Sequence, residues 1–564
     1  MKGNSFNMKR KLFASCSALV VAGFASSFGA AAPASASGSH ALVEGSGSSW
    51  SANAVNQWIA DVHSNGLQVV YNPTGSAQGR VDFANKTVDF SVSDIPYQGV
   101  DPVTHASDTS QGRAYSYLPI VAGGTSFPYQ LRVNGELVRN LRLSGTTIAK
   151  IFTNQITNWD DPAITQDNNG RKFPDLPIIP VVHSEGSGDT AQFTTWLATD
   201  YQSIWQPFGG PTYTEYFPRQ GAQVAENGSD SVMNFITSAA ANGSIGYNEY
   251  SYALGADYPV AKLLNKAGYY TLPNQYNVAV ALTKAKINYD KSNPQTYLTQ
   301  KLDQVYVNPE PQTYPLSSYS YLILPTASND ARMTTAKRQT IADYLYYAIC
   351  QGQKEMGPIG YSPLPINLVQ AGFQQIAKLH TADNGVNLTQ ENVSTCNNPT
   401  FIAGHPTENY LAKIAPKPAA CDKEGAGPCT TEVDQELGNP SGGHPTSTKG
   451  SGAGGSKSAS GGKSPTTSGS SPPTATGGSN QSGGSVPLPT GTSAASGGVV
   501  DPGTGAVTDT AATTGTVSAT ATTVAASPGH GLDVVLGVIA ALLLVVLLVV
   551  PPLVWQRFGG SREA

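Results

Sequence analysis

The stretch "VVHSEGSGDTAQFTTWL", residues 181–197, passes from an apolar run through a Gly/Ser turn into a helical pattern. Glycines and a serine at such a junction let the backbone turn sharply, and the free N–H groups at the start of the helix can receive an oxyanion. Asp189 follows the turn and adds a negative charge at the same place. The stretch therefore predicts a strand, a turn that can bind an anion, and a helix, with an unusual charge balance.

The same alternation of strands and helices extends over residues 41–400. Short apolar runs at 67–72, 117–124, 176–183 and 320–325 read as buried strands. Amphipathic patterns separate them, as in "SANAVNQWIADVHSNG" and "QTIADYLYYAICQG". Such alternation favours an α/β architecture with helices on both faces of the sheets. Residues 41–400 are more than a single hydrophobic core usually accommodates, so two lobes are expected.

Two more Gly/Ser turns precede helical patterns, "GSGSSW" at 45–50 and "NPTGSAQG" at 72–79. Backbone N–H groups at a helix start and serine hydroxyls are neutral donors for an anion. One such turn is weak evidence, because most short Gly/Ser loops are only turns. Three of them together favour a shared anion site.

Both ends of the chain carry membrane signals. Residues 1–36 have a basic start, an apolar stretch and a small-residue cleavage site, as in a secretory signal peptide. Residues 439–530 are rich in Gly, Ser, Thr, Pro and Ala, and predict a disordered linker. The apolar run 533–555 suffices for one transmembrane helix. Arginines in the tail 556–564 place the C-terminus in the cytoplasm and the folded part outside the cell.

Charge and cysteine content narrow the function. The chain has 33 Lys and Arg and 38 Asp and Glu, and four of the bases but none of the acids lie in residues 1–36, so the mature net charge is about −9. A nucleic-acid binder would be basic, so none is expected. Four cysteines remain after cleavage, Cys350, Cys396, Cys421 and Cys429, and they suggest two disulfides. Cys421 and Cys429 could close a small loop, but all three pairings stay open.

The order of segments resembles the PstS-type phosphate-binding proteins of ABC importers, in an actinobacterial-like, membrane-anchored variant. The likeness covers nearly the whole folded part. It rests on "GSGSSW" at 45–50, "TVDFSVSDIPY" at 87–97, "LPIVAGG" at 118–124, "LSGTTIAKIFTNQITNWDDPAI" at 143–164, "GSGDTAQFTTWL" at 186–197 and "GSIGYNEYSYAL" at 243–254.

The resemblance implies a two-lobed type II periplasmic-binding-protein fold with a hinge of two crossing strands. The first lobe would comprise 41–121 plus 318–400, the second 125–315, and 401–438 would form a C-terminal extension. The crossings would fall near 121–124 and 316–321. Ligand binding would close the lobes by a hinge motion.

The resemblance also implies a ligand site built from hydroxyls, backbone N–H groups, one arginine and one aspartate. The matching positions are Ser49, Trp50, Ser76, Asp94, Ser187 and Gly188. The aspartate accepts the hydrogen of hydrogen phosphate, whereas sulfate has none to offer. For Asp94 a helix cap after a strand is the plain structural alternative.

Two departures put the ligand in question. The family's arginine falls on His183, which carries a full charge only in acidic surroundings or beside an acid such as Glu185. A family hydroxyl falls on Asp189, and an ionised carboxylate about 4 Å from an anion would weaken binding roughly a thousandfold. Three explanations stay open: Asp189 points outward and Thr190 supplies the hydroxyl, Asp189 is protonated, or the ligand differs. Arg80 could replace the lost cation, or could be a solvated surface residue.

These observations predict a monomeric extracytoplasmic solute-binding protein, anchored in the cell membrane by a single pass. It captures inorganic phosphate, or a related oxyanion, in an interlobe cleft for an ABC permease. The alternative is a cell-surface interaction or sensing protein that kept the fold without tight phosphate binding. His183, Ser187 and Asp189 have the residue types of a catalytic triad, but they crowd into seven consecutive positions, and no enzyme is expected. No metal or cofactor motif is recognised.

Overall fold

The computed structural model describes residues 40–429 except 294, 390–391 and 406–407. The predicted signal peptide 1–36, linker 439–530, transmembrane helix 533–555 and tail 556–564 lie outside the described residues, as does the end of the predicted extension. In the part of the chain that is described, no helix combines the length and the apolar character needed to span a bilayer.

A six-stranded sheet organises one half of the fold, with the strand order β13-β6-β18-β3-β1-β2. β1 pairs in parallel with β2 and β3, whereas β18 pairs antiparallel with β3 and β6. Its strands are β1 (Val43–Gly47), β2 (Val69–Asn72), β3 (Phe90–Ser93), β6 (Tyr115–Ser126), β13 (Asn248–Glu249) and β18 (Ser317–Pro325). Each of the four apolar runs that predict strands overlaps an observed strand, namely β2, β6, β10 or β18. The α/β prediction is therefore confirmed.

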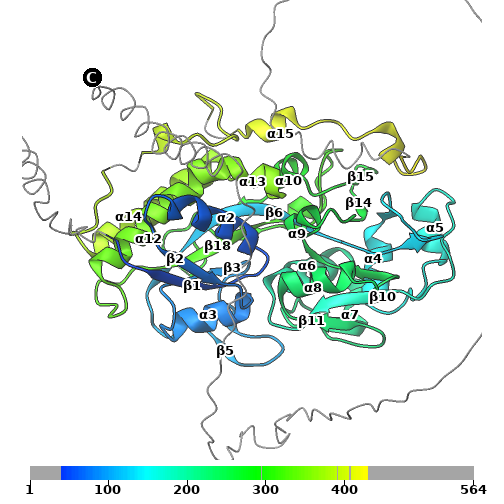
Figure 1. Ribbon diagram of the computed structural model, residues 1–564, viewed down its shortest axis with the longest axis horizontal. Helices are drawn as coiled ribbons and strands as arrows, with labels where there is room; N and C mark the ends of the chain where they lie inside the picture. Colours follow the sequence, from blue (N-terminus) through cyan, green and yellow to red (C-terminus); the bar gives the residue numbers. More distant parts are fainter. Residues whose placement is uncertain (1–39, 294, 390–391, 406–407, 430–564) are drawn as a thin grey trace, which may run out of the picture. The chain divides into compact units, whose positions relative to one another are not determined.

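Helices cover both faces of this sheet (Figure 1). α3 (Ser76–Ala84) packs on one face, and α2 (Ala52–His63), α12 (Thr335–Ile349) and α14 (Ile366–Ala382) lie on the other. Trp58 of α2 is completely buried, as are Ile341 and Leu345 of α12. Burying a large apolar side chain stabilises a fold by roughly 1.5–3 kcal/mol, so this amphipathic pattern is what attaches the helices to the sheet.

A second, three-stranded parallel sheet contains the start of the stretch 181–197 in its central strand. Its order is β11-β10-β12, with β10 (Ile179–His183) in the centre, β11 (Val224–Glu226) and β12 (Ser244–Gly246). Helices α6 (Gly188–Asp200), α7 (Gln202–Gly209) and α8 (Gly228–Thr237) accompany it. The central strand ends at His183, so the Gly/Ser turn that follows lies at the carboxyl edge of a parallel sheet, where α/β proteins place ligand sites.

The strands β6 and β18 connect the two halves. They pair antiparallel along their whole length, from Ser317 opposite Gly124 to Pro325 opposite Tyr115, with an irregularity between Ser320 and Tyr321. All of β18 and nearly all of β6 are buried. The two segments that the resemblance assigns to crossings, near 121–124 and 316–321, therefore lie side by side.

Short elements complete the described part of the chain. They are β4 (Gly99–Val100), β5 (Ser107–Asp108), β7 (Arg132–Val133), β8 (Glu136–Leu137), β9 (Arg142–Leu143), α4 (Gly145–Phe152), α5 (Pro162–Asp167), α9 (Tyr250–Gly255), β14 (Lys262–Leu264), β15 (Tyr270–Thr271), α10 (Gln275–Leu282), β16 (Lys286–Ile287), β17 (Gln300–Lys301), α11 (Asp303–Tyr306), η1 (Gln351–Glu355), α13 (Met356–Ile359), η2 (Val393–Thr395), α15 (Tyr410–Ile414) and η3 (Ala420–Asp422).

The four mature cysteines form two disulfides, as their even number predicts, and the structure selects Cys350 with Cys396 and Cys421 with Cys429. The second bond closes a loop that docks on the body of the fold. Arg142 donates hydrogen bonds to the carbonyl oxygens of Cys421 and Ala426, at 3.0 and 2.7 Å. The extension after residue 400 is therefore fixed to the fold as far as the second disulfide.

Removing the Cys421–Cys429 disulfide is expected to loosen this extension. A loop of about eight residues closed by a disulfide is stabilised by about 2.5 kcal/mol through the lost entropy of the open chain. The double variant Cys421→Ala/Cys429→Ala should therefore lose amide hydrogen-exchange protection over residues 410–429, while α12, which ends directly before Cys350 of the other disulfide, keeps it. Unchanged protection over 410–429 would show that side-chain contacts alone hold the extension.

Candidate functional site

The three Gly/Ser turns meet in the structure. Ser76, at the start of α3, donates a hydrogen bond from its Oγ to Asp94 Oδ2 at 3.1 Å. The backbone N–H of Ala77 donates to the carbonyl of Gly186 in the third turn at 3.0 Å. From the first turn, Ser48 also donates to Asp94 Oδ2, at 2.7 Å. Residues far apart in sequence thus converge on one point, as the three turns together predict.

Asp94 is the centre of this cluster. It follows β3, is 2% exposed and begins no helix, so the interpretation as a helix cap is wrong. Oδ1 accepts hydrogen bonds from Ser320 at 2.6 Å and from Ser51 at 3.3 Å, while Oδ2 accepts from Ser48 and Ser76. Burial raises the pKa of Asp94, these hydroxyls lower it, and the charge of Asp189 raises it again.

The third turn brings the backbone of α6 against the same carboxylate. Ser187 caps this helix, since its Oγ accepts the N–H of Thr190 at 3.4 Å. A Cβ on Gly188 would lie 2.3 Å from Asp94 Oδ2 and 2.5 Å from Ser76 Oγ. Only glycine allows α6 to begin this close to Asp94 and Ser76, and the first N–H groups of α6, which have no acceptor within the helix, lie at the same place.

His183 ends β10 beneath this turn and is 2% exposed. Its Nδ1 lies 2.8 Å from Glu185 Oε1, so the pairing with Glu185 that the sequence suggests is present. Burial alone would lower the pKa of His183, but the charge of Glu185 and the contacts with Asp189 and Glu185 outweigh it and raise the pKa to about 10. His183 therefore carries a positive charge at neutral pH.

This pKa makes a prediction for the folded protein. A histidine whose folded pKa lies above its ordinary value of about 6.5 contributes stability that is complete below pH 6.5 and is lost as the pH rises toward 10. Nitrogen chemical shifts of the His183 ring, measured by NMR, should show both nitrogens protonated at pH 8. A neutral ring at pH 8 would contradict the ion pair with Glu185.

Asp189 points into the cluster. It is 1% exposed, its Oδ1 accepts a hydrogen bond from the hydroxyl of Thr125, and its Oδ2 lies 3.6 Å from His183 Nε2. The hydroxyl of Thr190 contacts the Tyr247 hydroxyl at 2.7 Å instead. The explanation in which Asp189 faces outward and Thr190 replaces it is therefore wrong, because the cation of His183 holds the carboxylate inside.

Ser49 and Trp50 border the same region from the first turn. Ser49 Oγ lies 3.0 Å from Ser229 Oγ, at the start of α8. Trp50 is 2% exposed, and a Cβ on Gly123 of β6 would lie 2.7 Å from its ring. All nine predicted site residues are thus buried, and they come from four places: the β1–α2 junction, the β2–α3 junction, the end of β3 and the β10–α6 junction.

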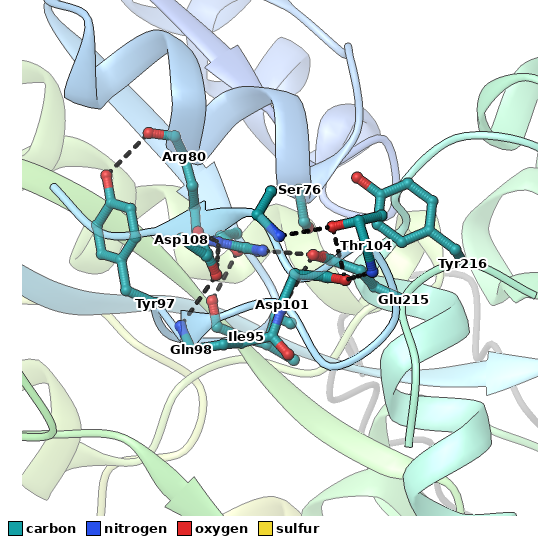
Figure 2. A network of polar contacts seen from close by, with 12 residues as sticks. Ser76, Arg80, Ile95, Tyr97, Gln98, Asp101, Thr104, Asp108, Glu215 and Tyr216 are labelled. Atoms are coloured by element: carbon teal, nitrogen blue, oxygen red, sulfur yellow. Dashed lines mark hydrogen bonds and ion pairs between the residues drawn. The ribbon is translucent and has the colours of Figure 1, made fainter. Parts of the chain in front are cut away.

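Arg80 belongs to the network of polar contacts drawn in Figure 2, which Ser76 also borders. It is 1% exposed, and its guanidinium donates to Asp108 Oδ1 at 2.9 Å and to Glu215 Oε1 at 2.7 Å. These two charges raise the pKa of Arg80 against the lowering effect of burial. The interpretation as a solvated surface arginine is therefore wrong. Because the guanidinium of Arg80 is already paired with two buried acids, Arg80 does not supply a free cation to the Asp94 cluster.

Several residues that contribute to the site are not predicted from the sequence. Ser48 and Ser51 lie within the quoted first turn, and Ser229 lies in "NGSDS", a fourth Gly/Ser turn ahead of a helix that could have been noticed. Thr125 and Ser320 sit inside buried strands and have no local signal. Only the pairing of β18 with β6 and with β3 brings such hydroxyls to the cluster.

Comparisons with known proteins agree with this geometry. A model described as the PBP superfamily domain matches residues 30–351, more than half of the chain. The phosphate-binding protein PstS 2 of Mycobacterium tuberculosis is 30% identical over 347 residues, which cover 60% of this chain and 86% of that protein. The phosphate-binding protein PstS of Xylella fastidiosa (strain Temecula1) is 28% identical over 330 residues, 58% of this chain and 83% of that protein.

Solved structures give a weaker likeness. A high-affinity periplasmic phosphate-binding protein with bound phosphate aligns at 22% identity and a TM-score of 0.47, over 62% of this chain and 99% of that one. A phosphate-binding protein from Stenotrophomonas maltophilia aligns at 19% identity and a TM-score of 0.43, over 59% and 93%.

Proposed function

The chain belongs to the PstS-type phosphate-binding proteins, the solute-binding proteins of ABC importers, and from this we propose that it captures inorganic phosphate or a related oxyanion in the crevice around Asp94. The observation that carries the proposal is the approach of Ser76 Oγ, Asp94 Oδ2 and the backbone of Gly188 to one another. Hydroxyls and helix-start N–H groups can replace the water around a small oxyanion without a covalent or catalytic step.

We further propose that the crevice lies between two lobes, 41–121 with 318–400 and 125–315, which open and close by bending β6 and β18. The contacts between Ala77 and Gly186 and between Arg80 and Glu215 join the proposed lobes. They would separate on opening and expose the crevice to a ligand. The closed surface would then dock on an ABC permease in the membrane.

For its place in the cell we propose export by the segment 1–36 and anchoring by the apolar run 533–555. The linker 439–530 would carry the lobes outside the membrane as a monomer. A flexible tether raises the effective concentration of a binding protein near its permease. Protease treatment of intact cells should release the folded part, whereas a cytoplasmic location would protect it.

Equilibrium binding tests the proposed function. Titration calorimetry of the purified protein with phosphate, from about pH 5 to pH 8, is expected to show micromolar or tighter binding in at least part of this range. Sulfate, which lacks a hydrogen to donate, should bind at least roughly a hundredfold more weakly. A folded protein that binds no phosphate at any pH would contradict the proposal.

That negative result would favour the second candidate, a surface interaction or sensing protein that kept the fold. One observation supports it: the pair of His183 and Asp189 already neutralises itself inside the crevice. Catalysis is not proposed. The two ring nitrogens of His183 face Glu185 and Asp189, so neither is directed to the hydroxyl of Ser187, which caps α6 instead.

A further inference from the structure

The hydrogen-bonding capacity of Asp94 is already used inside the protein. A carboxylate offers about four lone-pair sites. Ser48 and Ser76 donate to Oδ2 and Ser320 donates to Oδ1, at 2.6–3.1 Å, while Ser51 lies 3.3 Å from Oδ1 and closer to Ser320 Oγ, at 2.5 Å. A ligand that enters this crevice with a hydrogen to donate must displace one of these hydroxyls or find another acceptor.

Asp189 provides such an acceptor. Its Oδ2 is fully buried and has no hydrogen-bond partner among the described residues, and the same holds for Nε2 of His183. The two atoms lie 3.6 Å apart, too far for a good hydrogen bond. A buried donor and a buried acceptor thus lie side by side, each without a hydrogen bond to any described residue. Leaving a buried polar atom without a hydrogen bond costs free energy. A ligand presenting an acceptor oxygen next to a hydroxyl would pair with both.

A second buried donor and acceptor, Trp50 Nε1 and Glu249 Oε1, belong to side chains that pack against Gly123 of β6. A Cβ on Gly123 would approach both the ring of Trp50 and Glu249 Oε1, at 2.7 and 3.0 Å. Trp50 Nε1 and Glu249 Oε1 are also buried without hydrogen-bond partners in the described part of the chain. Gly123 and Thr125 are two residues apart on a strand and share a face, and Thr125 bonds to Asp189. Trp50, Glu249 and Asp189 therefore all lie against the same face of β6.

The charges around Asp189 also limit the ligand. The titratable groups that act on it or feel its charge are Asp94, His183, Glu185, Tyr247, Glu249, Tyr252 and Tyr314. Only His183 among them is a cation, and it is shared with Glu185 and Asp189. Burial raises the pKa of Glu249 well above its usual value and also raises that of Asp94. The burial that disfavours the charged form of these acids also disfavours a more negative ligand beside them.

We propose that Asp189 accepts a hydrogen from the ligand while His183 donates to the adjacent oxygen, so that this crevice selects dihydrogen phosphate, the monoanion, over the hydrogen phosphate dianion. The inference rests on the proposed function. It makes Asp189 a specificity-determining residue rather than a defect in the site. The monoanion has two hydroxyl groups and two acceptor oxygens, so one hydroxyl can donate to Asp189 Oδ2 while an adjacent oxygen accepts from His183 Nε2.

The proposal predicts a dependence of binding on pH that comes from the ligand. Phosphate loses its second hydrogen close to neutral pH, whereas His183, with a pKa of about 10, keeps its charge. When only the monoanion binds, the apparent affinity falls in proportion to its share of total phosphate. Calorimetry with the full protein should show roughly a tenfold or larger loss of phosphate affinity from about pH 6 to pH 8.5. At the higher pH about one proton per phosphate should be taken up, measured in buffers of different ionisation enthalpy.

The variant Asp189→Asn tests the residue itself. Its amide has the same size but can donate a hydrogen bond to a dianion, so the loss of affinity between the two pH values should shrink to about threefold or less. Sulfate should compete with phosphate for this variant and not for the unchanged protein. The control Asp160→Asn removes an exposed carboxylate elsewhere and should keep the original pH dependence.

The outcomes separate the inference from the function. Phosphate affinity that is equal at both pH values, or an Asp189→Asn variant with the original pH dependence, would overturn the inference and leave phosphate capture standing. No phosphate binding by either protein at any pH would overturn both. If Asp189→Asn does not fold, Asp189→Thr replaces it, and the proton uptake and sulfate exclusion of the unchanged protein still decide the question.

Discussion

The variant Gly188→Ala is expected to bind phosphate roughly 10- to 100-fold more weakly than the unchanged protein. The added methyl group would lie 2.3 Å from Asp94 Oδ2 and 2.5 Å from Ser76 Oγ, at the place where the three turns meet. Overpacking of this kind costs about 1–3 kcal/mol, and each 1.4 kcal/mol is tenfold in affinity. The methyl group also blocks the approach of an oxyanion to the N–H groups of α6. Calorimetric titration with phosphate at about pH 6 measures the effect.

A second glycine provides the control. Gly255, at the end of α9, has open space where a Cβ would lie, and no positive φ restricts it. Gly255→Ala should therefore leave both phosphate affinity and folding unchanged within error. Should Gly188→Ala bind phosphate as well as Gly255→Ala does, the crevice between Asp94 and α6 is not the ligand site.

The variant Arg80→Met is expected to lower the free energy of unfolding by about 3–5 kcal/mol at neutral pH. Methionine keeps much of the side-chain volume but leaves the carboxylates of Asp108 and Glu215 buried without their cation (Figure 2). Breaking a buried ion pair by removing one partner has this cost, because the remaining charge cannot be solvated. Urea denaturation followed by circular dichroism measures the change.

The pH dependence of this loss follows from the same network. Burial raises the pKa of Glu215 and the charge of Arg80 lowers it, so without the guanidinium the folded pKa of Glu215 would lie still further above its unfolded value. Protonation then relieves the unpaired charges, so the deficit should shrink as the pH is lowered below neutrality. As a control, Arg139→Met removes an ion pair with Asp257 whose side chains are 32% and 91% exposed, and should cost less than about 1 kcal/mol. Equal losses for the two variants would contradict the account of Arg80.

The fold was accessible from the sequence because its signals are local. A strand such as 179–183 is a run of apolar residues, and α2 shows its buried face through Ala54, Val55, Trp58 and Val62. The partner of a strand has no such signal. That β18 lies between β3 and β6 follows from chain topology, and the resemblance to a known family supplied only the two crossing segments near 121–124 and 316–321.

The site was accessible only in part. Turns with glycine and serine are visible locally, and Ser76, Asp94 and Gly188 do meet. Which way a charged side chain points depends on partners that are distant in sequence. Thr125 on β6 helps to hold Asp189 inside, and Glu215 is 135 residues from Arg80. The sequence left Asp189 and Arg80 undecided for this reason, and it offered no hint of Glu249.

The central claim is that the junctions at Ser76, Asp94 and Gly188 hold one small, hydrogen-bearing oxyanion. A crystal structure of the protein grown with phosphate at about pH 6 tests it most directly. The account predicts phosphate oxygens within hydrogen-bonding distance of Asp189 Oδ2, His183 Nε2 and the first N–H groups of α6. Phosphate bound at another place, with Asp189 and His183 still facing each other alone, would contradict it.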